Sequence, residues 1–181
     1  MIATLLHTAG MKAAPILWAS LGGLSSERSG IINIGLEGMM LAGAFFAVVG
    51  SAFLHSPWLG LLCAALAGGC FGLLHAWLCI RWRVDQIVSG IGINLLSLGI
   101  TGFLLLRIFG AHGNSPAVPK FNSFSLDFVH GIPIVGEPIA RLLFPLCALH
   151  LILVIAVGLI WWLFWKSVWG LRLRATARGR L

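Results

Sequence analysis

The sequence predicts an all-α protein, a polytopic bundle of about five transmembrane helices with a broken helix near residues 29–38. Composition is the first reason: 59% of the 181 residues are hydrophobic and 9% are charged, whereas an average soluble domain has about 25% charged residues. The 12 basic and 5 acidic side chains are too few to cover an apolar core in water. Lipid is therefore the expected surroundings, and at about 20 residues per span the length allows roughly five to seven spans.

Charge-free apolar runs are the second reason, and they locate the spans. No Asp, Glu, Lys or Arg occurs between Glu37 and Arg81, and Pro57 divides that stretch because proline interrupts helical hydrogen bonding. The four clearest spans are expected over about 38–54, 58–80, 87–106 and 142–165. The first span is less defined because Lys12 separates two short apolar runs. One tilted span, or a surface helix followed by a short span, fits this region.

The basic residues predict the orientation. Arg81 and Arg83 flank one turn, the tail from Lys166 onward is basic, and two spans separate them. Cytoplasmic segments carry the excess of Lys and Arg, so both are expected inside, with the C-terminus cytoplasmic and the N-terminus outside. This placement accounts for the net charge of +7. Nucleic acid is therefore not an expected partner, whereas membrane lipid is.

The segment 29–38 combines glycines with polar side chains. Gly30, Gly35 and Gly38 disfavour an uninterrupted helix, while Asn33 and Glu37 place an amide and a carboxylate at the same break. Broken helices at membrane depth line cavities and form transport sites. We expect Asn33 and Glu37 in a substrate pathway. The alternative is a cytoplasmic loop with Glu37 near a helix N-terminus, where the helix dipole favours a carboxylate.

A second polar group lies on one face of the helix expected at 87–106. Asn94, Ser97 and Thr101 follow Gly90 at helical spacing. This stripe suits a polar solute passage, and it equally suits hydrogen bonds between helices. At the start of the same helix, Asp85 and Gln86 are interpreted as a cap and interface pair, with a proton relay as the alternative.

A stripe of small residues recurs at every fourth position of the helix expected at 58–80. Small residues let two helices approach closely in lipid. We expect packing within one bundle, with a dimer face as the alternative. The stripe consists of Gly60, Ala64, Gly68, Gly72 and Ala76.

Catalytic and cofactor-binding patterns are not found in the sequence. It contains no H-E-x-x-H, no G-x-S-x-G and no Gly-Lys-Ser/Thr phosphate-binding loop. His75 lies within an expected span and is interpreted as a packed, hydrogen-bonded histidine, not as a metal ligand. We therefore expect no enzyme activity, no metal and no cofactor in this chain, so that any ATP would be hydrolysed by a separate subunit.

Four blocks of sequence resemble one family. They read SERSGIINIGLEGMML at 26–41, DQIVSGIGINLLSLGIT at 85–101, IPIVG at 132–136 and WGLRLRA at 169–175. The chain resembles the permease subunits of ABC importers for nucleosides and simple sugars, in the superfamily that includes branched-chain amino acid permeases. The NIGLEG version of the first block favours the nucleoside branch.

The resemblance implies a bacterial plasma-membrane subunit that moves a small-molecule solute by alternating access. Its implied partners are a second permease subunit, a cytoplasmic dimer of ABC ATPases and an extracytoplasmic solute-binding lipoprotein. The coupling segment that reaches the ATPase in this family would match Gly170, Arg172, Arg174 and Ala175. A basic anchor at the cytoplasmic surface is the alternative role of these arginines.

The resemblance stops near Ala175. Residues 1–175 are expected to form the N-terminal part of a permease domain of about 300 residues, and 176–181 a divergent tail. A truncated or frameshifted gene is the expected reason for this ending. The alternative function is therefore an inactive fragment or a non-transporting helix-bundle assembly protein.

Overall fold

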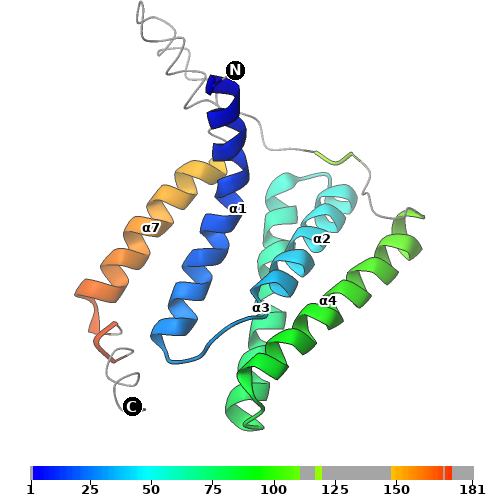
Figure 1. Ribbon diagram of the computed structural model, residues 1–181. Helices are drawn as coiled ribbons and strands as arrows, with labels where there is room; N and C mark the ends of the chain where they lie inside the picture. The colour runs from blue at the N-terminus through cyan, green and yellow to red at the C-terminus, as the bar shows by residue number, and fades with distance from the viewer. Residues whose placement is uncertain (1, 111–116, 120–147, 169, 173–181) are drawn as a thin grey trace, which may run out of the picture. The chain divides into compact units, whose positions relative to one another are not determined.

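The computed structural model describes residues 2–110, 117–119, 148–168 and 170–172, and α-helices joined by short non-helical connections make up this part of the protein (Figure 1). The predicted all-α class is confirmed. Five helices are described: α1 (Ile2–Arg28), α2 (Leu36–Leu54), α3 (Pro57–Arg81), α4 (Gln86–Phe109) and α7 (Ala148–Lys166).

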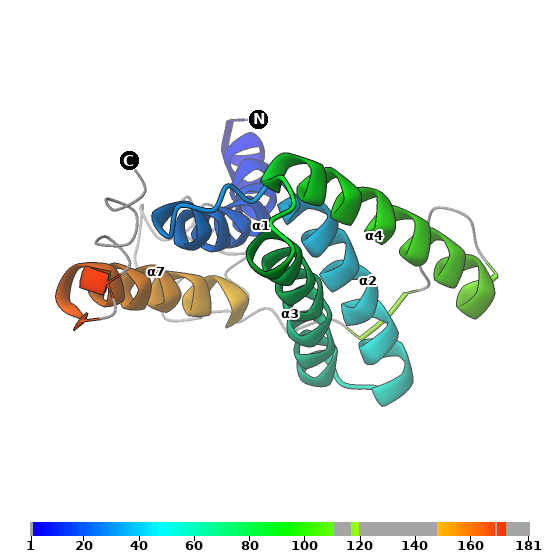
Figure 2. The ribbon, with the colours of Figure 1, turned by 90° about the horizontal axis from the view of Figure 1, so that it is seen from below.

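The chain divides into two compact units. Residues 30–120 form one, here called the central unit, with α2, α3 and α4; residues 1–29 and 121–181 form the other, with α1 and α7. In the central unit, α2 lies between α3 and α4 (Figure 2). Each unit is described by itself below.

Within the described residues, three helices are long and apolar enough to cross a membrane, and all three belong to the central unit: α2, α3 and α4. Their bounds agree within a few residues with the spans expected over 38–54, 58–80 and 87–106. The chain is thus an integral membrane protein. Membrane crossing by α1 and α7 remains a prediction, as does the direction in which the helices run across the bilayer.

The first helix is continuous over the region where the sequence left open one tilted span, or a surface helix followed by a short span. α1 is a single helix of 27 residues that continues through Lys12 and Pro15. Near its end, the Arg28 guanidinium lies over the Trp165 ring of α7 at 5.9 Å from the ring centroid. This cation–π contact joins the C-terminal turns of α1 and α7.

Local sequence signals set the ends of the central helices. The αL residue His55 ends α2, and Pro57 begins α3 at a position where a missing N–H costs little. Asp85 caps α4 as predicted, with its carboxylate accepting from the backbone N–H groups of Ile87 at 2.9 Å and Val88 at 3.1 Å. Gly110, with φ of +63°, ends α4.

The break predicted near residues 29–38 is present. α1 ends at Arg28, Gly30 adopts a φ of +83°, and α2 begins at Leu36. The connection between Ser29 and Leu36 is non-helical, here called the glycine connection.

The small-residue stripe of α3 faces α2. A Cβ added at Gly60 would lie 2.7 Å from the Ala47 carbonyl oxygen, and one added at Gly68 would lie 3.6 Å from the Met39 carbonyl oxygen. On the α2 side, a Cβ at Gly43 would lie 3.5 Å from the Ala64 oxygen. These contacts lie within one bundle, because α2, a neighbouring helix of the same unit, packs against the stripe.

Candidate functional site

The glycine connection and the start of α2 are bound to α4 through Asn94. The Gly38 backbone N–H donates to Asn94 Oδ1 at 2.8 Å, and Asn94 Nδ2 donates to the Ile34 carbonyl at 3.2 Å. One amide side chain therefore satisfies a donor in the first turn of α2, which has no partner within its own helix, and an acceptor in the connection. Asn94 is half-buried while it does so.

The polar stripe continues inward from Asn94. Ser97 Oγ donates to the Gly38 carbonyl at 2.6 Å, and one turn further Thr101 Oγ1 donates to the Ser97 carbonyl at 2.7 Å. Ser97 is fully buried and Thr101 nearly so. The two alternatives for this stripe were a solute passage and hydrogen bonds between helices. Asn94 and Ser97 form hydrogen bonds to α2, whereas the Thr101 bond stays within α4.

Glycines allow this close crossing. A Cβ at Gly38 would lie 2.8 Å from Asn94 Cα, and one at Gly90 would lie 3.0 Å from the Gly35 nitrogen. The first distance is shorter than real Cβ atoms show, and the second is tighter than nearly all real Cβ contacts. Gly38 of the first sequence block and Gly90 of the second are thus both required where the connection and α2 cross α4.

Two further side chains shape the glycine connection. Asn33 Oδ1 accepts from the Gly35 N–H at 3.1 Å, which closes a turn of the Asx type, and the half-buried Asn33 Nδ2 lies 3.6 Å from Met39 Sδ. Gln86 Oε1 accepts from the Ile32 N–H at 2.8 Å. Gln86 therefore ties the start of α4 to the glycine connection.

Glu37 differs from the other predicted pathway residues. It lies in the first turn of α2 and is exposed. A carboxylate in that position is stabilised by the helix dipole, which matches the second interpretation of Glu37. It is also the charged group nearest in sequence to the Gly38–Asn94 contact.

A second polar link joins α3 to α4. His75 Nδ1 lies 2.9 Å from Ser89 Oγ, and both side chains are buried. The expectation of a packed, hydrogen-bonded His75 is confirmed. Ser89 was not singled out from the sequence, although it lies two helical turns before Ser97 on the same face of α4.

An open cleft lies where the central helices meet the turn between α3 and α4. It has a volume of about 370 Å³, and none of the predicted pathway residues lines it. Its lining residues are Ile32, Cys79, Arg83, Val84, Asp85, Gln86 and Ile87. Within the described residues, no group of three metal-ligating side chains occurs.

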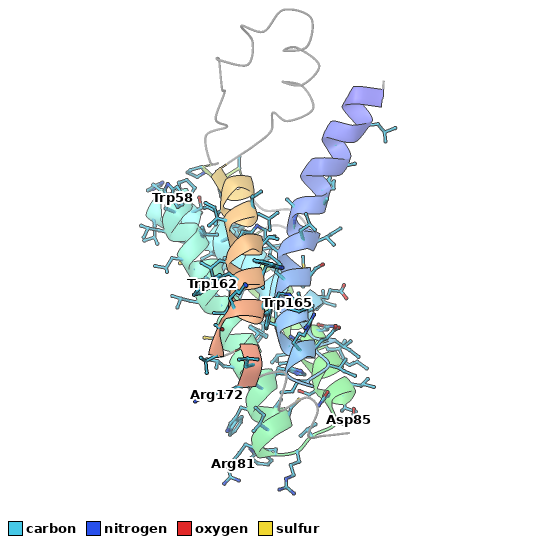
Figure 3. The ribbon with its side chains drawn as sticks, turned by 90° about the vertical axis from the view of Figure 1, so that its left-hand side faces the viewer. Trp58, Arg81, Asp85, Trp162, Trp165 and Arg172 are labelled. Atoms are coloured by element: carbon cyan, nitrogen blue, oxygen red, sulfur yellow. The ribbon has the colours of Figure 1, made fainter. Side chains whose placement is uncertain are left out.

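The predicted coupling residues follow α7 in the other unit. The Gly170 N–H donates to Ser167 Oγ at 3.2 Å, and a Cβ at Gly170 would lie 2.6 Å from the Leu163 carbonyl oxygen. The chain therefore turns back on the last turn of α7 at a position that accepts only glycine. Arg172 is exposed just beyond this turn (Figure 3). The remaining predicted coupling residues, Arg174 and Ala175, lie outside the described residues.

The structure thus brings Asn33, Asn94 and Ser97 together around the start of α2, with Thr101 deeper on α4. The break glycines Gly35 and Gly38 lie at the same contact. The small-residue stripe of α3 contacts α2 as well.

One known protein family matches nearly the whole chain. The family described as "Branched-chain amino acid transport system / permease component" matches residues 6–179. The guanosine ABC transporter permease protein NupQ of Bacillus subtilis is 39% identical over 170 residues, which is 90% of this chain and 52% of the relative. The nucleoside ABC transporter permease protein NupC of Lactococcus lactis is 35% identical over the same shares.

A more distant relative extends the range of named solutes. The glucose ABC transporter permease protein TsgB13 of Haloferax volcanii is 28% identical over 136 residues, covering 71% of this chain and 36% of the relative. The chain spans about half the length of the first two relatives. No solved structure matches it. The matched residues cover nearly the whole chain, and the chain therefore belongs to the family of branched-chain amino acid transport system permease components.

Proposed function

We propose that this chain is part of the membrane-spanning subunit of an ATP-driven importer for nucleosides or simple sugars. The names of the relatives, which refer to guanosine, nucleoside and glucose transport, support the solute classes. Residues 1–175 would contribute to the permease domain, and ATP would be hydrolysed by separate subunits.

One structural observation carries the proposal: the two longest sequence blocks form a single contact. Asn94 and Ser97 of the second block bind the backbone of Gly38 in the first. Alternating access needs parts that move as rigid bodies, and a polar contact between α2 and α4 makes these helices one such part.

The same contact divides the roles of the predicted pathway residues. The amide oxygen and nitrogen of Asn94 and the hydroxyl group of Ser97 already form hydrogen bonds within the protein. We assign to them the task of holding the pathway wall in place. Glu37, which is exposed at the start of α2, is the group we assign to the solute. A carboxylate can accept hydrogen bonds from the hydroxyl groups of ribose or of a sugar.

The proposed partners are a second permease subunit, a cytoplasmic ABC ATPase dimer and an extracytoplasmic solute-binding lipoprotein. The turn at Gly170 and the exposed Arg172 would belong to the surface that contacts the ATPase, together with Arg174 and Ala175. This assignment requires the end of α7 to face the cytoplasm, as the basic residues of the tail predict.

Reconstitution tests the proposal. The chain would be placed in proteoliposomes with its ATPase, second permease and solute-binding protein, and uptake of labelled guanosine, ribose and leucine would be measured with ATP or a non-hydrolysable analogue. ATP-dependent uptake of guanosine or ribose is expected. Uptake of leucine alone would overturn the solute class, and no uptake from an assembled complex would overturn transport by this chain.

A matched pair of variants tests the role of Glu37. Glu37→Gln is expected to raise the solute concentration needed for half-maximal uptake about tenfold, which is the effect of losing one charge-assisted hydrogen bond. Glu27→Gln makes the same chemical change at an exposed position near the end of α1 and is expected to leave uptake unchanged. Equal effects in both variants would contradict a solute contact at Glu37.

A further inference from the structure

We propose that the end of α3 binds the headgroup of an anionic phospholipid. A cleft of about 460 Å³ opens there, lined by Trp77, Arg81 and Trp82. It is separate from the cleft lined by Arg83 and Asp85, and it shares no residue with the predicted substrate pathway. The depth of the cleft in the membrane, its walls and its charge all favour such a headgroup.

The length of α3 sets the depth. At a rise of 1.5 Å per residue, the distance along the helix from Trp58 to Trp77 is about 28 Å, which is close to the roughly 30 Å thickness of the hydrocarbon core. Tryptophan favours the two membrane–water interfaces. With Trp58 at one interface and Trp77 at the other, Arg81 lies one turn further out, at the level of the lipid phosphates. Figure 3 shows Trp58 and Arg81 at opposite ends of α3.

Two tryptophan side chains form the walls. The rings of Trp77 and Trp82 meet edge to face, with centroids 5.8 Å apart and an interplanar angle of 67°. Both remain exposed, at 52% and 66%, so their faces and indole N–H groups are open to a ligand. The cleft lies between these two rings and Arg81.

Charge selects the kind of lipid. Arg81 is the only charged residue that lines the cleft within the described part of the chain. The nearest acid in sequence, Asp85, is occupied as the cap of α4. A phosphate that enters the cleft therefore meets a cation and indole N–H donors without a competing carboxylate. A choline or ethanolamine headgroup would bring its own cation against Arg81, so phosphatidylglycerol is expected to bind more tightly than phosphatidylcholine.

Native mass spectrometry of the full chain released from nanodiscs tests the proposal. The nanodiscs would contain equal amounts of phosphatidylglycerol and phosphatidylcholine, and the retained lipid would be counted by mass. The unmodified protein is expected to retain phosphatidylglycerol preferentially. Arg81→Gln is expected to reduce this preference about fivefold, which is the effect of removing one basic group near an anionic membrane surface. Arg81→Lys should preserve most of it.

Arg83→Gln is the matched control, because it removes the same charge two residues away in the neighbouring cleft. It is expected to retain the preference within about twofold. Trp82→Leu, which keeps an apolar side chain but removes the indole N–H, should weaken retention by an intermediate amount. Equal losses in the Arg81 and Arg83 variants would show that net charge alone attracts the lipid. That result, or no preference in the unmodified protein, would overturn the proposal.

Discussion

Helix α2 contacts its two neighbours in different ways. Toward α3, small residues bring the backbones together: a Cβ at Gly60 would lie 2.7 Å from the Ala47 oxygen, and one at Gly50 would lie 2.8 Å from Cys63 Sγ. Toward α4, the contact combines a glycine, Gly38, with side-chain hydrogen bonds from Asn94 and Ser97. Close backbone approach characterises the first interface, and the second combines close approach with hydrogen bonds.

The difference matters because lipid provides no hydrophobic force between helices. Association then depends on close packing and on hydrogen bonds. A packed glycine interface tolerates small shifts along its stripe, since van der Waals contacts are not directional. Hydrogen bonds to the backbone of one residue fix the register of α4 on α2. The α2–α4 contact should therefore respond to single changes of either kind, and the α2–α3 contact only to changes of volume.

Substitution at Gly38 should have the largest effect, because it disturbs packing and polarity together. An added Cβ would meet Asn94 Cα and Asn94 Oδ1, each at 2.8 Å. Gly38→Ala is expected to lower the free energy of unfolding by about 3 kcal/mol. The measurement is circular dichroism during SDS titration in mixed micelles. Gly99→Ala, on α4 with nothing within 4 Å of the added Cβ, should raise stability by up to about 1 kcal/mol.

Substitution at Gly60 should follow, since it affects packing alone. Gly60→Ala would press against the Ala47 oxygen and Ser51 and is expected to cost about 1–2 kcal/mol in the same assay. The control on the same helix is Gly69→Ala, where no atom lies within 4 Å. If both variants of α3 were equally stable, the close contact between α2 and α3 would be wrong.

Removing the Asn94 side chain should cost less than overpacking. Asn94→Ala leaves the Gly38 N–H and the Ile34 carbonyl without their partner. These two bonds, one to α2 and one to the glycine connection, should together amount to about 1–2 kcal/mol in a membrane. The helical content should be unchanged while the unfolding midpoint falls. A midpoint equal to that of the unmodified protein would show that these bonds do not hold α4 in register.

The smallest effects should separate the two hydroxyl groups of the stripe. Ser97→Ala removes the bond to the Gly38 carbonyl and is expected to cost about 0.6 kcal/mol. Thr101→Val keeps the shape of the side chain and removes only bonds within α4, so its effect should be smaller still. A double-mutant cycle should couple Ser97 with Asn94, which share Gly38, but not Thr101 with Asn94.

Much of the fold was predictable because lipid makes the signals strong. A charge-free stretch divided by Pro57 and an aspartate at the start of α4 each had one structural meaning, and both were found. The break after Arg28 was also predictable from its glycines. The contact between Asn94 and Gly38 was not, because spacing along one helix shows which side chains share a face but not which backbone group lies opposite.

The site was predictable only in part for the same reason. Gly90, Asn94, Ser97 and Thr101 were expected on one face, and the choice between a solute passage and an interhelical contact needed the position of α2. The link between His75 and Ser89 depended likewise on how α3 and α4 cross. The sequence alone contains no measure of that crossing.

The Gly38–Asn94 hydrogen bond also has a consequence for the order of membrane assembly. Its partners are 56 residues apart, and at about 5–20 residues per second a ribosome needs roughly 3–11 s to make that length. During this interval the Gly38 N–H, in the first turn of α2, has no partner from α4, while α2 and α3 can already pair as a hairpin. Insertion of α4 then completes the central unit, so a ribosome paused before Asn94 would hold an intermediate whose α2 still lacks its final partner.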